Sequence, residues 1–410
     1  MNPSDVASIR AWVTESGLAG ATEREILNGF SERCAAAGMR LTRSTLLIDT
    51  LHPVYEGRLF RWRNDGQTEQ DMLEYGRTTE DGPSAATWRQ SVFFHMLGGG
   101  AAEFRRNLTR ELSPEFPMLE TMRDEGAVDY AAFIHRFAQE GSFGDMDCVY
   151  SHWTSHHPEG FSEAEFRALR ELLPCLALAI KATSLARVAG TLAHVYLGRD
   201  AGSRVLAGRI ARGVAERIDA VLWFSDLRGY TAITDTASPD EIIPLLNDYA
   251  AIVIDSVHAA GGDVLKLMGD GVLAIFRAED RERACRCALQ AESALRERLV
   301  ALKERRRGEG RPVTSVYLGL HIGDVLFGNI GSEDRLDFTV VGPAVNEVSR
   351  ISSMCRSVER GVVTSSAFAD AVAPEDRARL VSLGRYALKG VGRAQELFTL
   401  DPAMAGSTPP

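Results

Sequence analysis

The sequence predicts two domains of mixed α/β character, the second of which is an α/β sandwich. Two observations lead to this fold class. The chain has 410 residues, which is long for one compact domain, so two domains of ordinary size are the natural division. Within residues 218–400, apolar strand-like runs alternate with amphipathic helical stretches, and this alternation is typical of a sheet covered by helices.

The composition is that of an ordinary globular protein, and it limits the classes of partner. Hydrophobic residues make up 45% of the chain, charged residues make up 25%, and the formal net charge is −10. We therefore expect no broad adhesion to nucleic acid or to an anionic membrane surface. The N-terminus lacks a basic segment followed by an apolar core, and no later run approaches the length needed to span a bilayer, which predicts a cytoplasmic location. The six cysteines form no CxxC pair, which predicts buried free thiols.

Residues 1–185 predict an α+β domain. Apolar residues recur at helical spacing near the N-terminus, and the run Ala35-Ala36-Ala37-Gly38 ends that helical region. A turn-rich or helical segment is expected at 114–139. Strand-like stretches are expected at 44–51, 55–62 and 146–153. A sensory or ligand-binding domain has this mixture of elements, and so does a purely structural domain.

Two groups of side chains in this domain allow both a functional and a structural interpretation. Three histidines are compatible with a metal or haem site, although such residues are more often simply solvated: His152, His156 and His157. Four bulky residues are compatible with a pocket lining, although side chains of this kind more commonly pack in the core: Trp88, Phe93, Phe94 and Met96.

A long helix is expected to close the first domain. Ser162-Glu163-Ala164-Glu165 is a capping-box pattern, and apolar residues then recur at helical intervals from about 163, with interruption, to Tyr196. The segment resembles the last helix of a GAF domain, which in that family commonly packs in a dimer and leads into an output domain. The resemblance implies a GAF-like sensor domain that regulates the second domain, with a small-molecule ligand as a candidate partner. Residues 186–217 are expected to form a helical connector, and four glycines fall in its part from Leu197 onwards.

Two acidic residues mark the start of the second domain. The apolar run from Val221 leads into Asp226 and then into a glycine and hydroxyls, as a buried strand followed by a turn would. Residues 263–276 predict two strands joined by a Gly-Asp-Gly hairpin turn with Asp270 at its tip. Carboxylates at the ends of neighbouring strands suit Mg²⁺, which shares its coordination sphere with substrate phosphates. Alternatively, Asp226 caps a helix and Asp270 only makes the turn.

Further strands and helices follow in alternation. A charged amphipathic helix is expected at 281–307, a strand at 313–322, a glycine-punctuated loop at 323–331, a strand at 338–341 and a helix at 343–354. On that last helix Asn346 and Arg350 are four residues apart, so they share one face and can reach a single anionic centre. An amide donor and a guanidinium aimed at one point suit charge developing on phosphorus, although an ordinary surface hydrogen bond uses the same pair.

At this point the sequence resembles the class III nucleotidyl cyclase catalytic domain. The resemblance spans about 218–400, and five motifs occur in order: Phe224 to Thr231, Lys266 with Gly269-Asp270-Gly271, Gly323 to Gly331, Thr339 to Arg350, and Leu388-Lys389-Gly390-Val391. It implies a ferredoxin-like catalytic domain after the GAF-like domain, with a disordered tail at 401–410.

The resemblance also implies roles for individual residues. Asp226 and Asp270, with the backbone of Leu227, match the metal ligands that hold two Mg²⁺ or Mn²⁺ ions per active site. Lys266 and Thr339 match the positions that read the purine edge. The remaining implied roles are ribose orientation by Asn346, transition-state binding by Arg350, outer phosphate binding by Arg335 and Lys389, and phosphate binding by the segment Leu227, Arg228, Gly229, Tyr230 and Thr231.

In this family each active site is shared between two catalytic domains. Since one domain here carries every role, the resemblance implies a homodimer with two equivalent sites. A lysine donor with a hydroxyl acceptor fits the edge of adenine, so ATP is the expected substrate and cyclic AMP the expected product. Threonine both donates and accepts, so a guanylate cyclase stays an alternative, and so does a non-catalytic nucleotide-binding dimerisation module.

Overall fold

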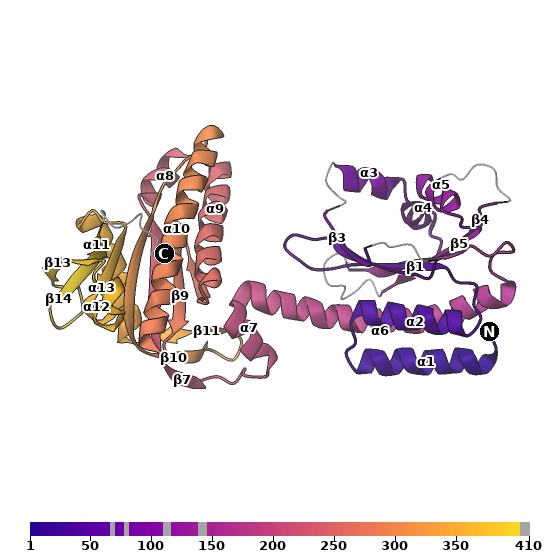
Figure 1. Cartoon of the computed structure of the whole chain (residues 1–410), viewed down its shortest axis with the longest axis horizontal. Helices are drawn as coiled ribbons and strands as arrows, with labels where there is room; N and C mark the ends of the chain where they lie inside the picture. The colour runs from indigo at the N-terminus through magenta and orange to yellow at the C-terminus, as the bar shows by residue number, and fades with distance from the viewer. Residues whose placement is uncertain (66–69, 78–81, 110–115, 138–145, 402–410) are drawn as a thin grey trace. The chain divides into compact units, whose positions relative to one another are not determined.

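The computed structural model describes residues 1–65, 70–77, 82–109, 116–137 and 146–401 (Figure 1). The chain divides into two compact units, Met1–Leu192 and Ala193–Pro410. The predicted tail beyond residue 401 lies outside the described residues.

The first unit is an antiparallel sheet with helices on both faces. Its strand order is β3-β2-β1-β6-β5-β4. The strands are β1 (Arg43–Asp49), β2 (Gly57–Arg63), β3 (Met72–Tyr75), β4 (Glu103–Asn107), β5 (Asp129–Arg136) and β6 (Cys148–Ser155). One face packs on α2 (Glu23–Ala36) and α6 (Glu163–Leu197), and α1 (Pro3–Leu18) packs on the far side of these two helices within the same apolar core (Figure 1). The other face packs on α4 (Val92–Gly99) and α5 (Pro117–Asp124), beside which α3 (Pro83–Arg89) lies (Figure 1).

The expected strands at 44–51, 55–62 and 146–153 are confirmed as β1, β2 and β6, but the expectation for 114–139 is wrong in part. After α5, this segment forms the inner strand β5, in which the first six residues are buried. Its Ala-Ala-Phe-Ile run is apolar on both faces because both faces are covered by helices, so it shows no alternation that identifies a strand.

The capping box of α6 is confirmed. The Ser162 amide donates to Glu165 Oε2 at 2.7 Å, and the Glu165 amide donates to Ser162 Oγ at 3.3 Å. The helix continues without interruption through Pro174 for 35 residues.

Contrary to the expectation that no run is long enough, α6 and α9 (Pro239–Ala259) are long and apolar enough to cross a membrane by length and composition. Leu169 and Leu172 of α6, and Val253 of α9, are almost completely buried inside their units. A core helix of a soluble protein has the same composition, so this finding is weak evidence for a membrane span.

The centre of the second unit is a β-α-β-β-α-β arrangement, the ferredoxin-like connectivity. It consists of β7 (Ala215–Leu227), α9, β8 (Asp263–Met268), β9 (Gly271–Arg277), α10 (Arg281–Gly308) and β10 (Val316–Gly331). The four strands lie in the order β10-β7-β9-β8, and each pair of neighbours is antiparallel. Helices α9 and α10 pack on one face through side chains such as Tyr249 and Leu295.

The remaining elements extend this sheet and cover its second face. They are β11 (Leu336–Val341), α11 (Pro343–Ser357), β12 (Val362–Ser365), α12 (Ser366–Ala371), α13 (Pro374–Arg377), β13 (Leu380–Tyr386) and β14 (Gln395–Leu400). Both β11 and β12 pair with the edge of β10 that faces away from β7, β12 in parallel near the start of β10 and β11 antiparallel near its end. α11 packs on the second face through Val348 and Ile351.

The expected loop at 323–331 is wrong, because β10 runs through it as one strand of 16 residues. Its glycines serve close packing instead of turning the chain. A Cβ at Gly328 would lie 2.2 Å from the Val214 carbonyl oxygen, and one at Gly319 would lie 2.6 Å from the Ser352 amide nitrogen. The expected connector at 186–217 is also more structured than its glycines suggest, because it holds α7 (Arg199–Leu206) and the first residues of β7.

Candidate active site

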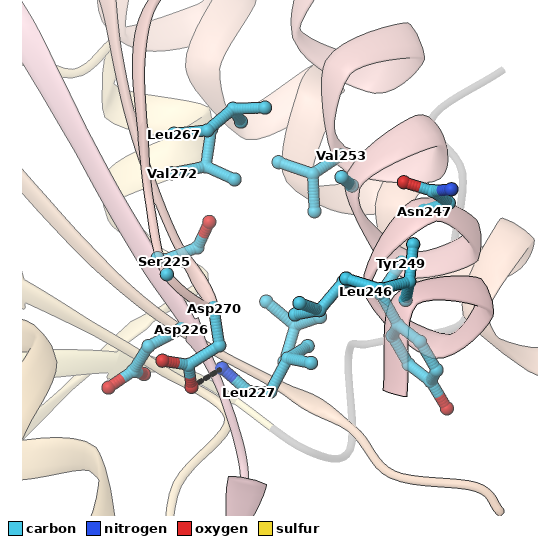
Figure 2. Close-up of a pocket in the computed structure, with 15 residues that line it drawn as sticks. Ser225, Asp226, Leu227, Leu246, Asn247, Tyr249, Val253, Leu267, Asp270 and Val272 are labelled. Carbon is cyan, nitrogen blue, oxygen red and sulfur yellow. Dashed lines mark hydrogen bonds between the residues drawn. The ribbon is translucent and has the colours of Figure 1, made fainter. Parts of the chain in front are cut away.

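The fold brings Asp226 and Asp270 together. Asp226 is the penultimate residue of β7, and Asp270 lies in the tight turn between β8 and β9, where Met268 pairs with Gly271. Gly269 adopts φ +63°, a conformation that favours glycine, so the turn depends on it. The Leu227 amide donates to Asp270 Oδ2 at 3.3 Å and fixes the turn beside the end of β7 (Figure 2).

Both acids line a cavity of about 190 Å³ between the strand ends and α9. Figure 2 shows the two carboxylates at one end of this cavity and the side chains of Leu246, Tyr249 and Val253 across from the strands. The cavity is therefore polar at the acids and apolar along the helix.

Asp226 is held in an unfavourable environment for a charge. Its side chain is half-buried, and its Oδ1 atom is buried without a hydrogen-bond partner among the described residues. Burial, together with the nearby Asp270 carboxylate, raises the pKa of Asp226 to about 6, although Arg356 on α11 opposes both effects. Sequence reasoning missed Arg356, although it lies six residues beyond Arg350 on the same helix.

The two acids fit a divalent cation. A buried carboxylate oxygen without a partner, next to a second carboxylate, is the donor set that Mg²⁺ or Mn²⁺ takes from protein when substrate phosphates and water complete its sphere. Within the described ranges no group of three or more histidine, cysteine, aspartate or glutamate side chains is placed so that it could hold a metal ion by itself. The remaining ligands would therefore be backbone oxygens, water and phosphate.

The expected base-reading pair lies elsewhere in the second unit. Lys266 on β8 forms an ion pair with Asp337 on β11, and both side chains are partly exposed. Thr339 is two residues beyond Asp337, so the two side chains lie on the same face of β11. The structure thus places Lys266 near Thr339 and adds Asp337, an acid that sequence reasoning missed. Its position two residues before Thr339 was the available signal.

Asn346 and Arg350 lie one turn apart on α11 and are exposed. Within the described part of the chain neither side chain has a hydrogen bond or an ion pair. The expected phosphate ligands Arg335 and Lys389 are also exposed, and they lie in the loops that precede β11 and β14. None of these four residues lines the cavity that holds the two acids, nor does Lys266 or Thr339.

The resemblance implies phosphate binding by residues 227–231, but two backbone amides of this segment already have partners. The Leu227 amide is bonded to Asp270, and the Arg228 amide donates to the Ser315 carbonyl oxygen at 2.8 Å. Only the amides from Gly229 onwards, where α8 (Tyr230–Thr236) begins without a side-chain cap, stay available for a ligand.

Residues 214–401 match the family model described as the adenylate and guanylate cyclase catalytic domain. This part of the chain belongs to that cyclase family. The cyclase domain is 29% identical over 197 residues to adenylate cyclase 1 of Rhizobium meliloti, a match that covers 47% of this chain and 29% of the relative. An adenylate cyclase of Anabaena cylindrica is 33% identical over 168 residues, which covers 40% of this chain and 33% of the relative.

Among solved structures, the crystal structure of the adenylyl cyclase CyaB from P. aeruginosa matches with 24% identity and a TM-score of 0.42, covering 46% of this chain and 96% of that one. The matched part of the chain spans about a third of the length of each of the two adenylate cyclases named above.

The histidines of the first unit do not form a metal cluster with other ligating side chains in the described residues. His152 is 3% exposed and stacks on Tyr130 with 5.4 Å between ring centroids, so it is a buried sheet residue rather than a solvated one. His156 and His157 follow the end of β6.

Proposed function

We propose that this protein is a homodimeric adenylate cyclase, which converts ATP to 3′,5′-cyclic AMP and pyrophosphate with the help of two Mg²⁺ or Mn²⁺ ions per site. The observation that carries the proposal is the pair of carboxylates, Asp226 and Asp270, at one cavity of a cyclase catalytic domain.

The two acids are the residues that would hold the cations. When bound, such ions lower the pKa of the ribose 3′-hydroxyl and neutralise charge on the triphosphate and the leaving pyrophosphate. The charge that develops on the α-phosphoryl oxygens needs a donor with fixed geometry, and the Arg350 guanidinium supplies it. Asn346 on the same helix face orients the ribose, because its amide both donates to and accepts from hydroxyls.

We infer an active site shared between two copies of the chain from the residues that are missing from the lining of this cavity. Its volume of about 190 Å³ is below the range of about 300–1,000 Å³ that is usual for small-molecule sites. The acids line it, whereas Lys266, Thr339, Asn346 and Arg350 do not. A second copy of the chain that places these four groups over the acids would complete the pocket, and two-fold symmetry would then create two equal sites.

Base selection rests on Lys266 and the polar groups beside it. The lysine donates to the adenine N1 acceptor, and Thr339 accepts from the 6-amino group. Because Lys266 is paired with Asp337, a second acceptor is close to the base site. The Thr339 hydroxyl can also donate a hydrogen bond, as an acceptor on guanine would require. Guanylate cyclase activity is therefore the second candidate, and GTP is the substrate to compare with ATP.

We also propose a cytoplasmic protein whose first unit regulates the cyclase domain. The net charge of −10 supports the location, and so does the burial of apolar residues of α6 and α9 inside their units. The proposal includes a GAF-like first unit and a homodimeric assembly.

The test uses the full chain with Mn²⁺ and either ATP or GTP, and it measures cyclic nucleotide and pyrophosphate. Asp270→Ala and Arg350→Ala are each expected to abolish turnover without loss of folded protein. An equimolar mixture of the two variants should recover activity, because a mixed dimer holds one intact site. The exposed residues Asp370 and Arg360 provide matched controls, and their alanine variants should retain full activity.

Two results would overturn the proposal in different ways. Binding of ATP without any cyclic product in the wild type would indicate the non-catalytic module. Turnover by the wild type without recovery in demonstrated mixed dimers would refute the shared site while leaving the activity in place.

A further inference from the structure

The first unit contains a large cavity that has no part in the cyclase chemistry. Its volume is about 800 Å³, and it lies between one face of the sheet, formed by β1, β2 and β6, and the helices α3, α4 and α5. A volume of this size is within the usual range for small-molecule sites.

Two polar side chains that line this cavity are buried without a partner. Thr45 is 1% exposed and His152 is 3% exposed, and neither Thr45 Oγ1 nor His152 Nδ1 has a hydrogen bond among the described residues. They are direct cross-strand neighbours of β1 and β6, so both side chains lie on the same face at the same level. A hydroxyl and a ring nitrogen left unpaired in the interior each destabilise the fold, and a bound polar group would remove that cost.

Guanidinium groups surround this pair. Arg61 on β2 is the other cross-strand neighbour of Thr45, and Arg43 lies two residues before Thr45 on β1, with Glu125 at 3.2 Å from its guanidinium. Burial lowers the pKa of His152 well below its ordinary value, and Arg43 and Arg61 lower it further. The imidazole is therefore neutral, and it lies in a positive local potential that favours an anion.

The next level of the cavity is apolar and aromatic. Leu47 is two residues beyond Thr45 and pairs with Tyr150 on β6. The Tyr150 ring lies 5.2 Å from Phe93 and 5.5 Å from Trp88, centroid to centroid. Of the bulky residues considered in the sequence, Trp88 and Phe93 thus line the cavity, whereas Met96 is in the core and Phe94 is exposed. Residues two apart on a strand are separated by roughly 6.6 Å, so the polar level at Thr45 and the apolar level at Leu47 lie close together. A ligand that fills both levels must therefore carry its anionic group directly on its flat apolar part.

The far end of the cavity limits the charge of the occupant. Asp49, Glu56 and Asp147 line it there, and Asp49 is four residues from Thr45 on the same strand, roughly 13 Å away. These carboxylates repel a ligand with several negative charges, and they leave room for one anionic group at the Thr45 end.

We propose that this cavity is a binding site for a small aromatic monocarboxylate. The carboxylate accepts hydrogen bonds from Thr45 and His152, and the ring lies among Phe93, Trp88 and Tyr150. The occupied site would satisfy the two orphaned polar atoms and fill the apolar level of the cavity.

The test is isothermal titration calorimetry on the full chain with benzoate, 2-naphthoate and 9-anthracenecarboxylate, and with the amide of each as a neutral ligand of the same shape. At least one carboxylate should bind, and its affinity should exceed that of its amide by tenfold or more, because hydrogen bonds to a charged group are stronger than those to a neutral one. Thr45→Val preserves the shape of the side chain and should weaken carboxylate binding about tenfold, with little effect on the amide.

Thr154→Val is the matched control. Thr154 is also 1% exposed with an unpartnered hydroxyl on β6, but it does not line the cavity, so its variant should bind like the wild type. The proposal is overturned if no carboxylate binds, if the amides bind equally well, or if both threonine variants weaken binding alike. If Thr45→Val fails to fold, the ratio of carboxylate affinity to amide affinity in the wild type still tests the proposal. No nucleotide is present, so the outcome is independent of the proposed cyclase activity.

Discussion

Replacing Asp226 by asparagine is expected to stabilise the metal-free second unit while destroying its activity. The pKa of Asp226 rises from 3.8 to about 6 on folding, a difference of roughly two pKa units. At about 1.36 kcal/mol per unit, ionised Asp226 costs the folded state roughly 3 kcal/mol. This is an upper limit for the gain, because Asp226 is only half-buried and solvent screens part of the interaction.

The sign of this effect depends on pH in a defined way. Below pH 3.8 the carboxyl group is protonated in both the folded and the unfolded state, so the substitution changes little. Between pH 3.8 and 6 the unfolded state ionises first, and above pH 6 the full cost is present. The gain from Asp226→Asn should therefore be largest at pH 7.5 and less than half as large near pH 4.5.

Scanning calorimetry in EDTA at these two pH values measures the gain, provided that the transition of the second unit is resolved from that of the first. Asp219→Asn on the same strand is the control. Asp219 forms an ion pair with Arg281, whose side chain is 57% exposed, so its loss should lower stability by at most about 1 kcal/mol. Mn²⁺ should stabilise the wild type but not Asp226→Asn. An unchanged or reduced stability of Asp226→Asn at pH 7.5, or an equal gain at both pH values, would refute the reasoning.

Three further predictions concern other parts of the chain. The stability of the first unit should fall as the pH drops below 6.5, because buried His152 has a lowered pKa and resists protonation, and His152→Gln should show a smaller drop in urea midpoint between pH 7.5 and 5.5. Gly319→Ala should cost about 1–3 kcal/mol in urea unfolding, because its Cβ would lie 2.6 Å from a backbone nitrogen of α11, whereas Gly392→Ala meets no neighbour and serves as the control. Lys266→Ala should change stability by less than about 1 kcal/mol, because its ion pair with Asp337 is partly exposed, yet reduce ATP turnover at least tenfold in the cyclic AMP assay.

The sequence predicted the acidic part of the site because local rules decide it. A buried strand that ends in an acid and a Gly-Asp-Gly turn each specify their own geometry, so Asp226 and Asp270 were placed without knowledge of the sheet. Asn346 and Arg350 were placed by helical spacing in the same way.

Contacts between segments that are distant in the sequence could not be predicted from local sequence patterns. Glycines mark turns in most sequences, but Gly328 of β10 is required by the close approach of Val214, which is more than a hundred positions earlier. The effects of Arg356 on Asp226 and of Asp337 on Lys266 likewise depend on how α11 and β11 pack, and no local pattern specifies that packing. The strand β5 was missed because its neighbours cover both faces and remove the alternation of polar and apolar residues.

The two acids of the cavity differ in a way that bears on their use. Asp270 is held by the Leu227 amide, so its carboxylate is already oriented, whereas Asp226 keeps a buried oxygen without a partner beside a second negative charge. Selection for stability alone would replace such a residue with a neutral one of similar shape. A cation held by the two carboxylates would remove both the repulsion and the unpaired atom, so the same arrangement that weakens the metal-free domain would favour the metal-loaded one. We therefore expect metal binding and domain stability to be coupled chiefly through Asp226, with Asp270 contributing mainly to geometry.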